Sequence, residues 1–193
     1  MKNKISILIA VLAASAMISS AQSSNTVFSE ERTSKPYHFI NIKGVMNIKL
    51  VQDETPGVVV EGNKYQLGNT ITMLRNDTLF VYQTNIRSGD SKTFLSIRVN
   101  EISLLEVSGK TKVDCSGLVN ADYLTVRAKD GAQIKLDVRA LKVESKVTGC
   151  SFITITGSTV SNVENTDGCG IIDSHLLDVV EREKTVTRYC PVY

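Results

Sequence analysis

The chain contains no tryptophan and only three prolines among its 193 residues. The prolines are Pro36, Pro56 and Pro191, so the long stretch from Gly57 to Cys190 has none. Proline cannot donate a backbone hydrogen bond, and central strands of a sheet exclude it for that reason. No segment after residue 21 shows helical periodicity over ten residues or more. The sequence therefore predicts an all-β protein with uninterrupted ladders.

The first 21 residues have the pattern of a secretory signal peptide. Lys2 and Lys4 make the start basic, residues 5–18 are apolar and uncharged, and Ser19-Ser20-Ala21 offers small residues for cleavage. The apolar stretch is too short to span a bilayer comfortably. No cysteine comes directly after it, where a lipid anchor would be attached. We expect residues 1–21 to be removed, leaving no transmembrane span. The protein is then exported, to the periplasm or to the cell surface.

The exported chain lacks an excess of either charge. Removal of Lys2 and Lys4 with the signal leaves 20 basic against 20 acidic residues. A nucleic-acid partner needs a basic face, and electrostatic binding to a membrane needs a basic patch. The balanced charge therefore argues against both classes of partner, and the remaining length fits one domain.

Alternation with period two begins near Tyr37. Residues 22–35 are polar and aperiodic, which predicts a flexible leader. Beyond them apolar residues recur at every second position, as in Leu95, Ile97 and Val99, which is typical of strands with one face in the interior. We expect a single β-domain over residues 37–193.

A pattern of roughly 18 residues repeats over the last ninety positions. Five valines mark it with gaps of 19, 17, 20 and 16, and bend glycines follow: Gly109, Gly131, Gly149 and Gly168. Repeats this short cannot each enclose a core, so they bury apolar residues by stacking on their neighbours, as in a solenoid. The prediction is a β-solenoid with rungs of roughly 16–20 residues. Its stacked core comprises Val107, Val126, Val143, Val163, Ile134, Ile153 and Leu136.

The order of several motifs resembles a family of exported bacterial proteins common in Bacteroidetes, the putative auto-transporter adhesin "head GIN" domain (DUF2807). After the signal peptide come a strand pair over residues 39–48, Val58-Val59-Val60-Glu61-Gly62, and Asn76-Asp77-Thr78-Leu79 before a strand. Leu104-Leu105-Glu106-Val107-Ser108-Gly109 then starts the repeats. The resemblance covers roughly residues 37–193. It implies a right-handed β-helix and adhesion without an established chemistry.

Four cysteines follow the signal, with spacings that match no zinc motif. Cys150 and Cys169 each come directly after a bend glycine, so they should stack in adjacent rungs within reach of a disulfide. Export makes such a bond chemically reasonable. The alternative is a ladder of free thiols, and Cys115 is expected to lie in the core.

Candidate catalytic or metal-binding residues are few. His38 and His175 are the only histidines, and neither lies in a catalytic or metal motif. Asp130 and Asp167 precede bend glycines, where Asp-Gly is ordinary turn chemistry. Arg127, Lys129 and Lys142 are expected on a solvated face. The sequence therefore predicts no catalytic residue, metal or cofactor.

These observations favour a non-enzymatic exported binding module, an adhesin or envelope protein whose partner is a glycan or an envelope or host-surface protein. Two alternatives stay open: a carbohydrate-active β-helix enzyme, either a polysaccharide lyase or a hydrolase, and a structural protein that assembles with copies of itself. The C-terminal rung, Thr185 to Tyr193, carries few charges and ends the stack. Unpaired backbone groups at such an end invite another chain, so self-association or ligand binding is expected there.

Overall fold

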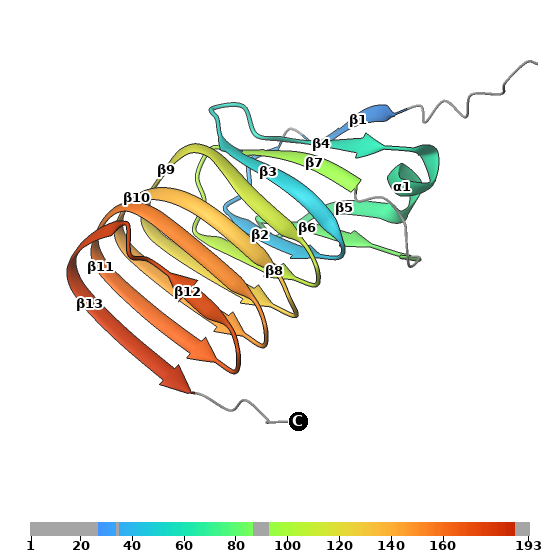
Figure 1. The fold of residues 1–193 in the computed structure, drawn as a ribbon. Helices are drawn as coiled ribbons and strands as arrows, with labels where there is room; N and C mark the ends of the chain where they lie inside the picture. The colour runs from blue at the N-terminus through green and yellow to red at the C-terminus, as the bar shows by residue number, and fades with distance from the viewer. Residues whose placement is uncertain (1–26, 34, 87–92, 188–193) are drawn as a thin grey trace, which may run out of the picture.

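The computed structural model describes residues 27–33, 35–86 and 93–187. The predicted signal peptide therefore lies outside the described residues, as does Tyr193. The fold is all-β, with thirteen strands in one sheet and one short helix in the described part (Figure 1). The sheet curls around the apolar side chains and nearly closes on itself. The elements in chain order are β1 (Phe28–Thr33), β2 (Phe39–Lys43), β3 (Met46–Gln52), β4 (Gly57–Gly62), α1 (Lys64–Asn69), β5 (Thr70–Arg75), β6 (Thr78–Gln83), β7 (Thr93–Val99), β8 (Leu104–Ser108), β9 (Lys112–Lys129), β10 (Gln133–Thr148), β11 (Phe152–Asp167), β12 (Ile171–Asp173) and β13 (Leu177–Thr187).

The leader predicted over residues 22–35 is wrong in its second half. Residues 28–33 form β1, which pairs antiparallel with β4 at the edge of the sheet. The Arg32 guanidinium donates to the carbonyl oxygen of Leu67 at 2.7 Å, and Arg98 forms an ion pair with Glu31 at 2.9 Å. An edge strand that is exposed on both faces carries no apolar alternation, so its sequence does not distinguish it from a loop.

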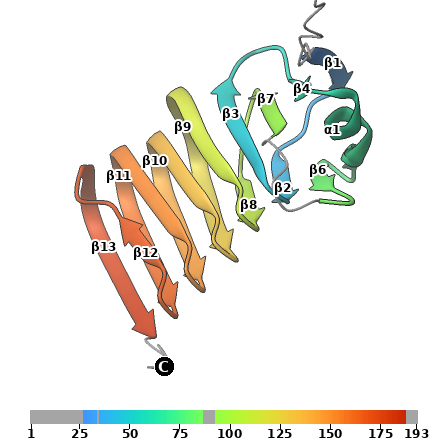
Figure 2. The same cartoon turned by 45° about the vertical axis from the view of Figure 1, so that its right-hand side comes forward.

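The hairpin between β5 and β6 confirms the predicted turn. Asn76 and Asp77 both adopt positive φ, at 47° and 63°, as a two-residue hairpin turn requires. The adjacent helix α1 is only one and a half turns long and begins with a capping box, in which Asn63 and Gln66 satisfy each other's backbone N–H groups. Together these elements close one end of the molecule (Figure 2).

Four long strands, β9, β10, β11 and β13, stack in parallel at the other end (Figures 1 and 2). Their register follows the predicted repeat: Ile134 pairs with Ile153, and Ile153 with Ile172. Paired residues are therefore 19 apart between β10 and β11, 20 apart between β11 and β13, and 21 and then 19 apart along β9 and β10. All four bend glycines have positive φ, at 81°, 87°, 68° and 86° for Gly109, Gly131, Gly149 and Gly168, which confirms the bends.

The predicted valine column is only partly correct. Val107, Val126 and Val143 are fully buried, but they do not stack on one another, since Val107 pairs with Ala128, Val126 with Ser145 and Val143 with Asn162. Val163 pairs with Glu144 and is half-buried. Val143 and Val163 are 20 residues apart, one more than the register of 19 between β10 and β11, so Val163 falls one position past the partner of Val143. A one-residue slip moves a side chain to the other face. The remaining members of the predicted core, Ile134, Ile153 and Leu136, are buried.

The interior changes from apolar to polar along the stack. One inward column runs Ile40, Leu105 and Val126, then Ser145 and Glu164, through consecutive register partners. Glu164 is fully buried, accepts a hydrogen bond from Asn162 Nδ2 at 2.8 Å, and lies 3.3 Å from Lys184 Nζ of β13. This column is therefore polar in β10 and β11, whereas the neighbouring column of Ile134, Ile153 and Ile172 stays aliphatic.

Candidate functional site

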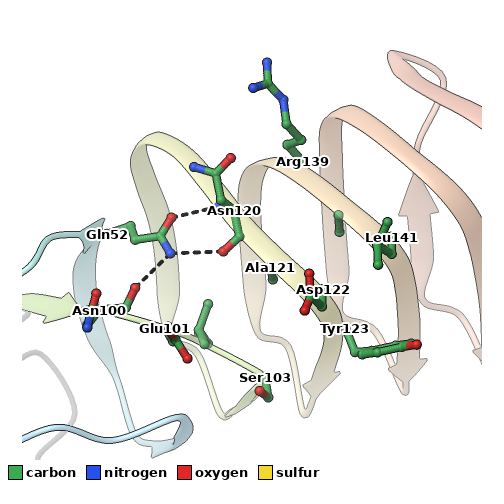
Figure 3. A pocket seen from close by; sticks show the side chains of 12 residues that line it. Gln52, Asn100, Glu101, Ser103, Asn120, Ala121, Asp122, Tyr123, Arg139 and Leu141 are labelled. Carbon is green, nitrogen blue, oxygen red and sulfur yellow. Dashed lines mark hydrogen bonds between the residues drawn. The ribbon is translucent and has the colours of Figure 1, made fainter.

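A groove of about 770 Å³ opens on the outside of the stack, beside the first coils (Figure 3). It lies where β3, the β7–β8 connection, β9 and β10 come together. Its lining residues are Gln52, Asn100, Glu101, Ile102, Ser103, Asn120, Ala121, Asp122, Tyr123, Arg139, Ala140 and Leu141.

Gln52 fixes one wall of the groove. Its Nε2 donates to the carbonyl oxygens of Asn100 at 2.8 Å and Asn120 at 3.0 Å, and its Oε1 accepts from the backbone N–H of Asn120 at 2.7 Å (Figure 3). One amide thus ties three separate segments together. The groove is held by side-chain and backbone bonds before any ligand arrives, which lowers the ordering cost of binding.

The opposite wall presents apolar surface to solvent. Tyr123 is 67% exposed and Leu141 is 53% exposed. Both lie at the bend where strand pairing skips residues 122 and 141, so their side chains point away from the core. Since Val160 and Val180 occupy the equivalent bends of β11 and β13, an apolar ridge of Leu141, Val160 and Val180 runs from the groove to the end of the stack.

The polar groups of the groove are of both charges. Glu101, Asp122 and Arg139 are exposed, and Arg139 points away from Tyr123 (Figure 3). His38 Nε2 lies 3.5 Å from Glu101, and its Nδ1 lies 2.8 Å from Asp77. The groove can therefore donate and accept hydrogen bonds around an exposed aromatic ring, the composition of a binding site for a polar ligand with an apolar face.

The predicted Cys150–Cys169 disulfide is not formed. Cys150 is a free, exposed thiol, whereas Cys169 belongs to a disulfide that does not include Cys150. Equivalent residues of stacked parallel strands have parallel Cα–Cβ vectors, which keeps their Cβ atoms near the strand spacing and beyond the usual disulfide distance. Cys115 packs against the core as predicted, and burial raises the pKa of its thiol to about 11.

The other singled-out residues have local roles in the structure. Asp130 adopts a positive φ of 58° before Gly131, as its turn chemistry predicts. His175 contacts Asp173 two residues away, and this hydrogen bond lowers the pKa of the Asp173 carboxyl. Asp167 ends β11, where its carbonyl oxygen accepts from the N–H of Gly149 at 3.1 Å. Within residues 27–33, 35–86 and 93–187, no three His, Cys, Asp or Glu side chains come together as metal ligands.

The predicted solvated face forms ion pairs. Lys129 Nζ lies 2.7 Å from Glu106, and Arg127 lies 3.8 Å from the same carboxylate. This face carries a second, more polar groove of about 720 Å³, which also includes Lys146 and Asp167. Lys142 is half-buried beside it.

The groove beside Gln52 and Tyr123 was not predicted from the sequence. Its residues are distant in the chain, from Gln52 to Leu141, and nothing in the pattern places them together. One sign was available: Tyr123 and Leu141 interrupt the polar positions of their strands. An apolar residue at an outward bend is visible as such only once the register is known.

Comparison with known proteins identifies relatives. The family described as "Putative auto-transporter adhesin, head GIN domain" (DUF2807) matches residues 36–186. A putative adhesin from Parabacteroides merdae is similar in structure, with a TM-score of 0.72 and 14% identity over 86% of this chain and 80% of that chain. A second putative adhesin, from Parabacteroides distasonis, has a TM-score of 0.67 and 15% identity over 86% and 81% of the two chains.

A putative lipid binding protein from Parabacteroides distasonis is also similar, with a TM-score of 0.67 and 13% identity over 86% of this chain and 82% of that chain. At these identities the likeness shows a shared fold. Comparison with curated proteins finds no match. In the described part of the chain, no helix has the length and apolar character needed to cross a membrane. Since the family model matches most of the sequence, the chain belongs to the DUF2807 family, the head GIN domain of putative auto-transporter adhesins.

Proposed function

We propose that this protein is an exported, non-enzymatic binding module whose groove at Tyr123 and Leu141 receives a glycan of the cell envelope or of a host surface. One observation carries the proposal: an exposed ring and an exposed aliphatic side chain lie beside amide, carboxylate and guanidinium groups in a groove of about 770 Å³. Export is supported by the signal-like segment at residues 1–21. The compartment is the periplasm or the cell surface.

The mechanism is presentation on a rigid wall. We infer that the stacked parallel strands wind as a right-handed β-helix, the hand that parallel β-crossovers almost always adopt. Backbone hydrogen bonds between coils hold the outward side chains at the strand spacing of about 4.8 Å. A sugar ring has an apolar face and a rim of hydroxyls. The apolar face fits against Tyr123, while Asp122 and Asn120 supply partners for the hydroxyls.

The names of two relatives support an adhesive role, and the name of a third supports lipid binding. The two roles predict different ligands for the same groove. A glycan needs the hydrogen-bonding groups around Asp122, whereas an acyl chain needs mainly the apolar ridge.

The test is a glycan array followed by calorimetry with the purified protein. Tyr123→Ala should weaken glycan binding by roughly tenfold or more, because the ring supplies most of the apolar contact. The matched control is Phe94→Ala, which removes an aromatic side chain that is 55% exposed and lies outside the groove. Equal glycan binding by the wild type and both variants would show that the groove is not the glycan-binding site. Binding to lipid vesicles in place of glycans would favour the lipid-binding role.

A further inference from the structure

The last strand of the stack, β13, leaves one edge of the sheet unpaired. It pairs with β11 on one side, and no other strand within the described residues contacts its second side. The strand is eleven residues long. A free edge of that length presents a row of backbone N–H and C=O groups and is a template for another strand.

Charges on β13 are sorted by face. Arg182 and Lys184 pair in register with the buried Asn162 and Glu164, so they lie on the inward side of the sheet. Glu181 and Glu183 lie on the outward side, and Val186 follows on the inward side. The inward face carries two cations, 42% and 53% exposed, against the single carboxylate of Glu164. Among the described groups this leaves one positive charge in excess on the inward face. The Arg182 guanidinium also donates to Ser174 Oγ at 3.0 Å and to the carbonyl oxygen of Leu177 at 3.4 Å.

A second copy of the chain is a poor occupant of this edge. Two copies related by a twofold axis would pair their β13 strands antiparallel with inward faces together. Every register that pairs the charged stretch 181–184 with itself then places cation opposite cation and acid opposite acid, which is destabilising. Residues 188–193, Arg-Tyr-Cys-Pro-Val-Tyr, include no Asp or Glu side chain.

We propose that β13 is a docking edge for an extended segment of a partner protein that carries two acidic residues, two positions apart, flanked at the same spacing by apolar residues. The acids lie opposite Arg182 and Lys184, and one flanking apolar residue covers Val186 on the same inward face. The recognised pattern reads the same in both chain directions, and the apolar residues at its ends fix the register. This inference is independent of the ligand of the groove.

The experiment measures binding of a labelled synthetic peptide to the purified protein by fluorescence anisotropy. The peptide has valine, glutamate, glutamate and valine at alternating positions, with lysine or threonine between them. A second peptide with glutamine in place of both glutamates should bind roughly tenfold more weakly or worse. Lys184→Met should cause a similar loss, and the matched control Lys135→Met, an exposed lysine on β10 away from this edge, should cause none.

Each other outcome overturns the proposal. Equal binding of the two peptides would show that the edge does not distinguish glutamate from glutamine. Dimers in light scattering that disappear in Lys184→Met would make a second copy the occupant. Binding of the peptide only to a chain ending at Thr187, and not to the full chain, would make the last six residues the occupant. If the peptide bound neither chain, and circular dichroism showed both to be folded, the charges would serve only to protect the edge from pairing with other strands.

Discussion

The two ends of the strand stack limit the exposure of apolar surface in different ways. At the end formed by β1–β6 and α1, the interior is aliphatic, and a hairpin and a capped helix cover it. At the end formed by β11 and β13, the interior is partly polar, since Ser145, Asn162 and Glu164 are fully or almost fully buried beside the isoleucine column. A stack of coils must stop without exposing an apolar cross-section. This protein closes one end with additional structure and the other with a change of side-chain chemistry.

Exposing the polar end to solvent therefore costs less free energy than exposing the apolar end would. Arg182 and Lys184 can remain half-exposed there because their heads stay in water while Glu164 balances part of their charge. It is also the end with the free strand edge, which is why a partner is expected there. Substitutions at matched positions of the two ends test this contrast.

The largest effect is expected from a polar residue in the apolar part. Val107→Asn places an amide between Ile42 and Ala128, where no described side chain offers a hydrogen-bond partner. We expect the free energy of unfolding to fall by roughly 4 kcal/mol. Val163→Asn, at the half-buried outward position of β11, should cost under about 1 kcal/mol. Urea denaturation of both variants measures the difference, and equal losses would contradict the register described above.

Alanine substitution of a bend glycine is also expected to cost more stability at the apolar end than at the polar end. An added methyl group at Gly109 would lie 2.4 Å from the carbonyl oxygen of Gly44, in addition to the strain of its φ of 81°. At Gly168 the nearest atom would be 3.5 Å away, so only the strain of φ 86° remains. Gly109→Ala should lower the unfolding free energy by roughly 3 kcal/mol and Gly168→Ala by about 1 kcal/mol. Thermal denaturation checks the order, and a larger loss for Gly168→Ala would reverse the comparison.

The buried carboxylate should matter at the polar end. Glu164→Gln leaves Arg182 and Lys184 without a counter-charge and is expected to reduce the unfolding free energy by about 2 kcal/mol. The loss stays below that of a fully buried pair because both cations are partly exposed. The control is Glu183→Gln on the outward side of β13, where the change should be close to zero. If Glu164→Gln left the free energy of unfolding unchanged, the polar interior would not depend on this charge.

The smallest effect concerns the two free thiols. Burial raises the pKa of Cys115 to about 11, so its reactive thiolate is rare at neutral pH, whereas Cys150 is exposed. Iodoacetamide should modify Cys150 first, and mass spectrometry after limited reaction locates the product. Because burial favours the neutral thiol of Cys115, its contribution to stability is present below the pKa of the unfolded thiol and is lost as the pH rises towards 11. Modification of Cys115 before Cys150 would contradict this.

Local chemistry in the sequence was sufficient for the strands and bends. The alternation around Ile97 and the hairpin at Asn76-Asp77 are set by neighbouring residues, and the structure has both. The isoleucine column and the bend glycines follow from a repeat of 19 residues, since stacking repeats the same environment in each coil. The edge strand β1 was missed because a strand exposed on both faces is held by its neighbour's backbone and not by its own pattern.

Features that depend on register between distant residues were decided only by the tertiary structure. Where each long strand bends, two residues in succession face outward, which sets Tyr123 and Leu141 on the surface. A spacing one residue longer than the register of β10 and β11 places Val163 outside the core. The groove exists because the amide of Gln52 meets Asn120 across 68 residues of sequence. The sequence thus determined the repeating unit, because the unit is held by local conformation and period. Only the stacked fold decided which side chains meet, because a single residue of slip exchanges the inside of a strand for its outside.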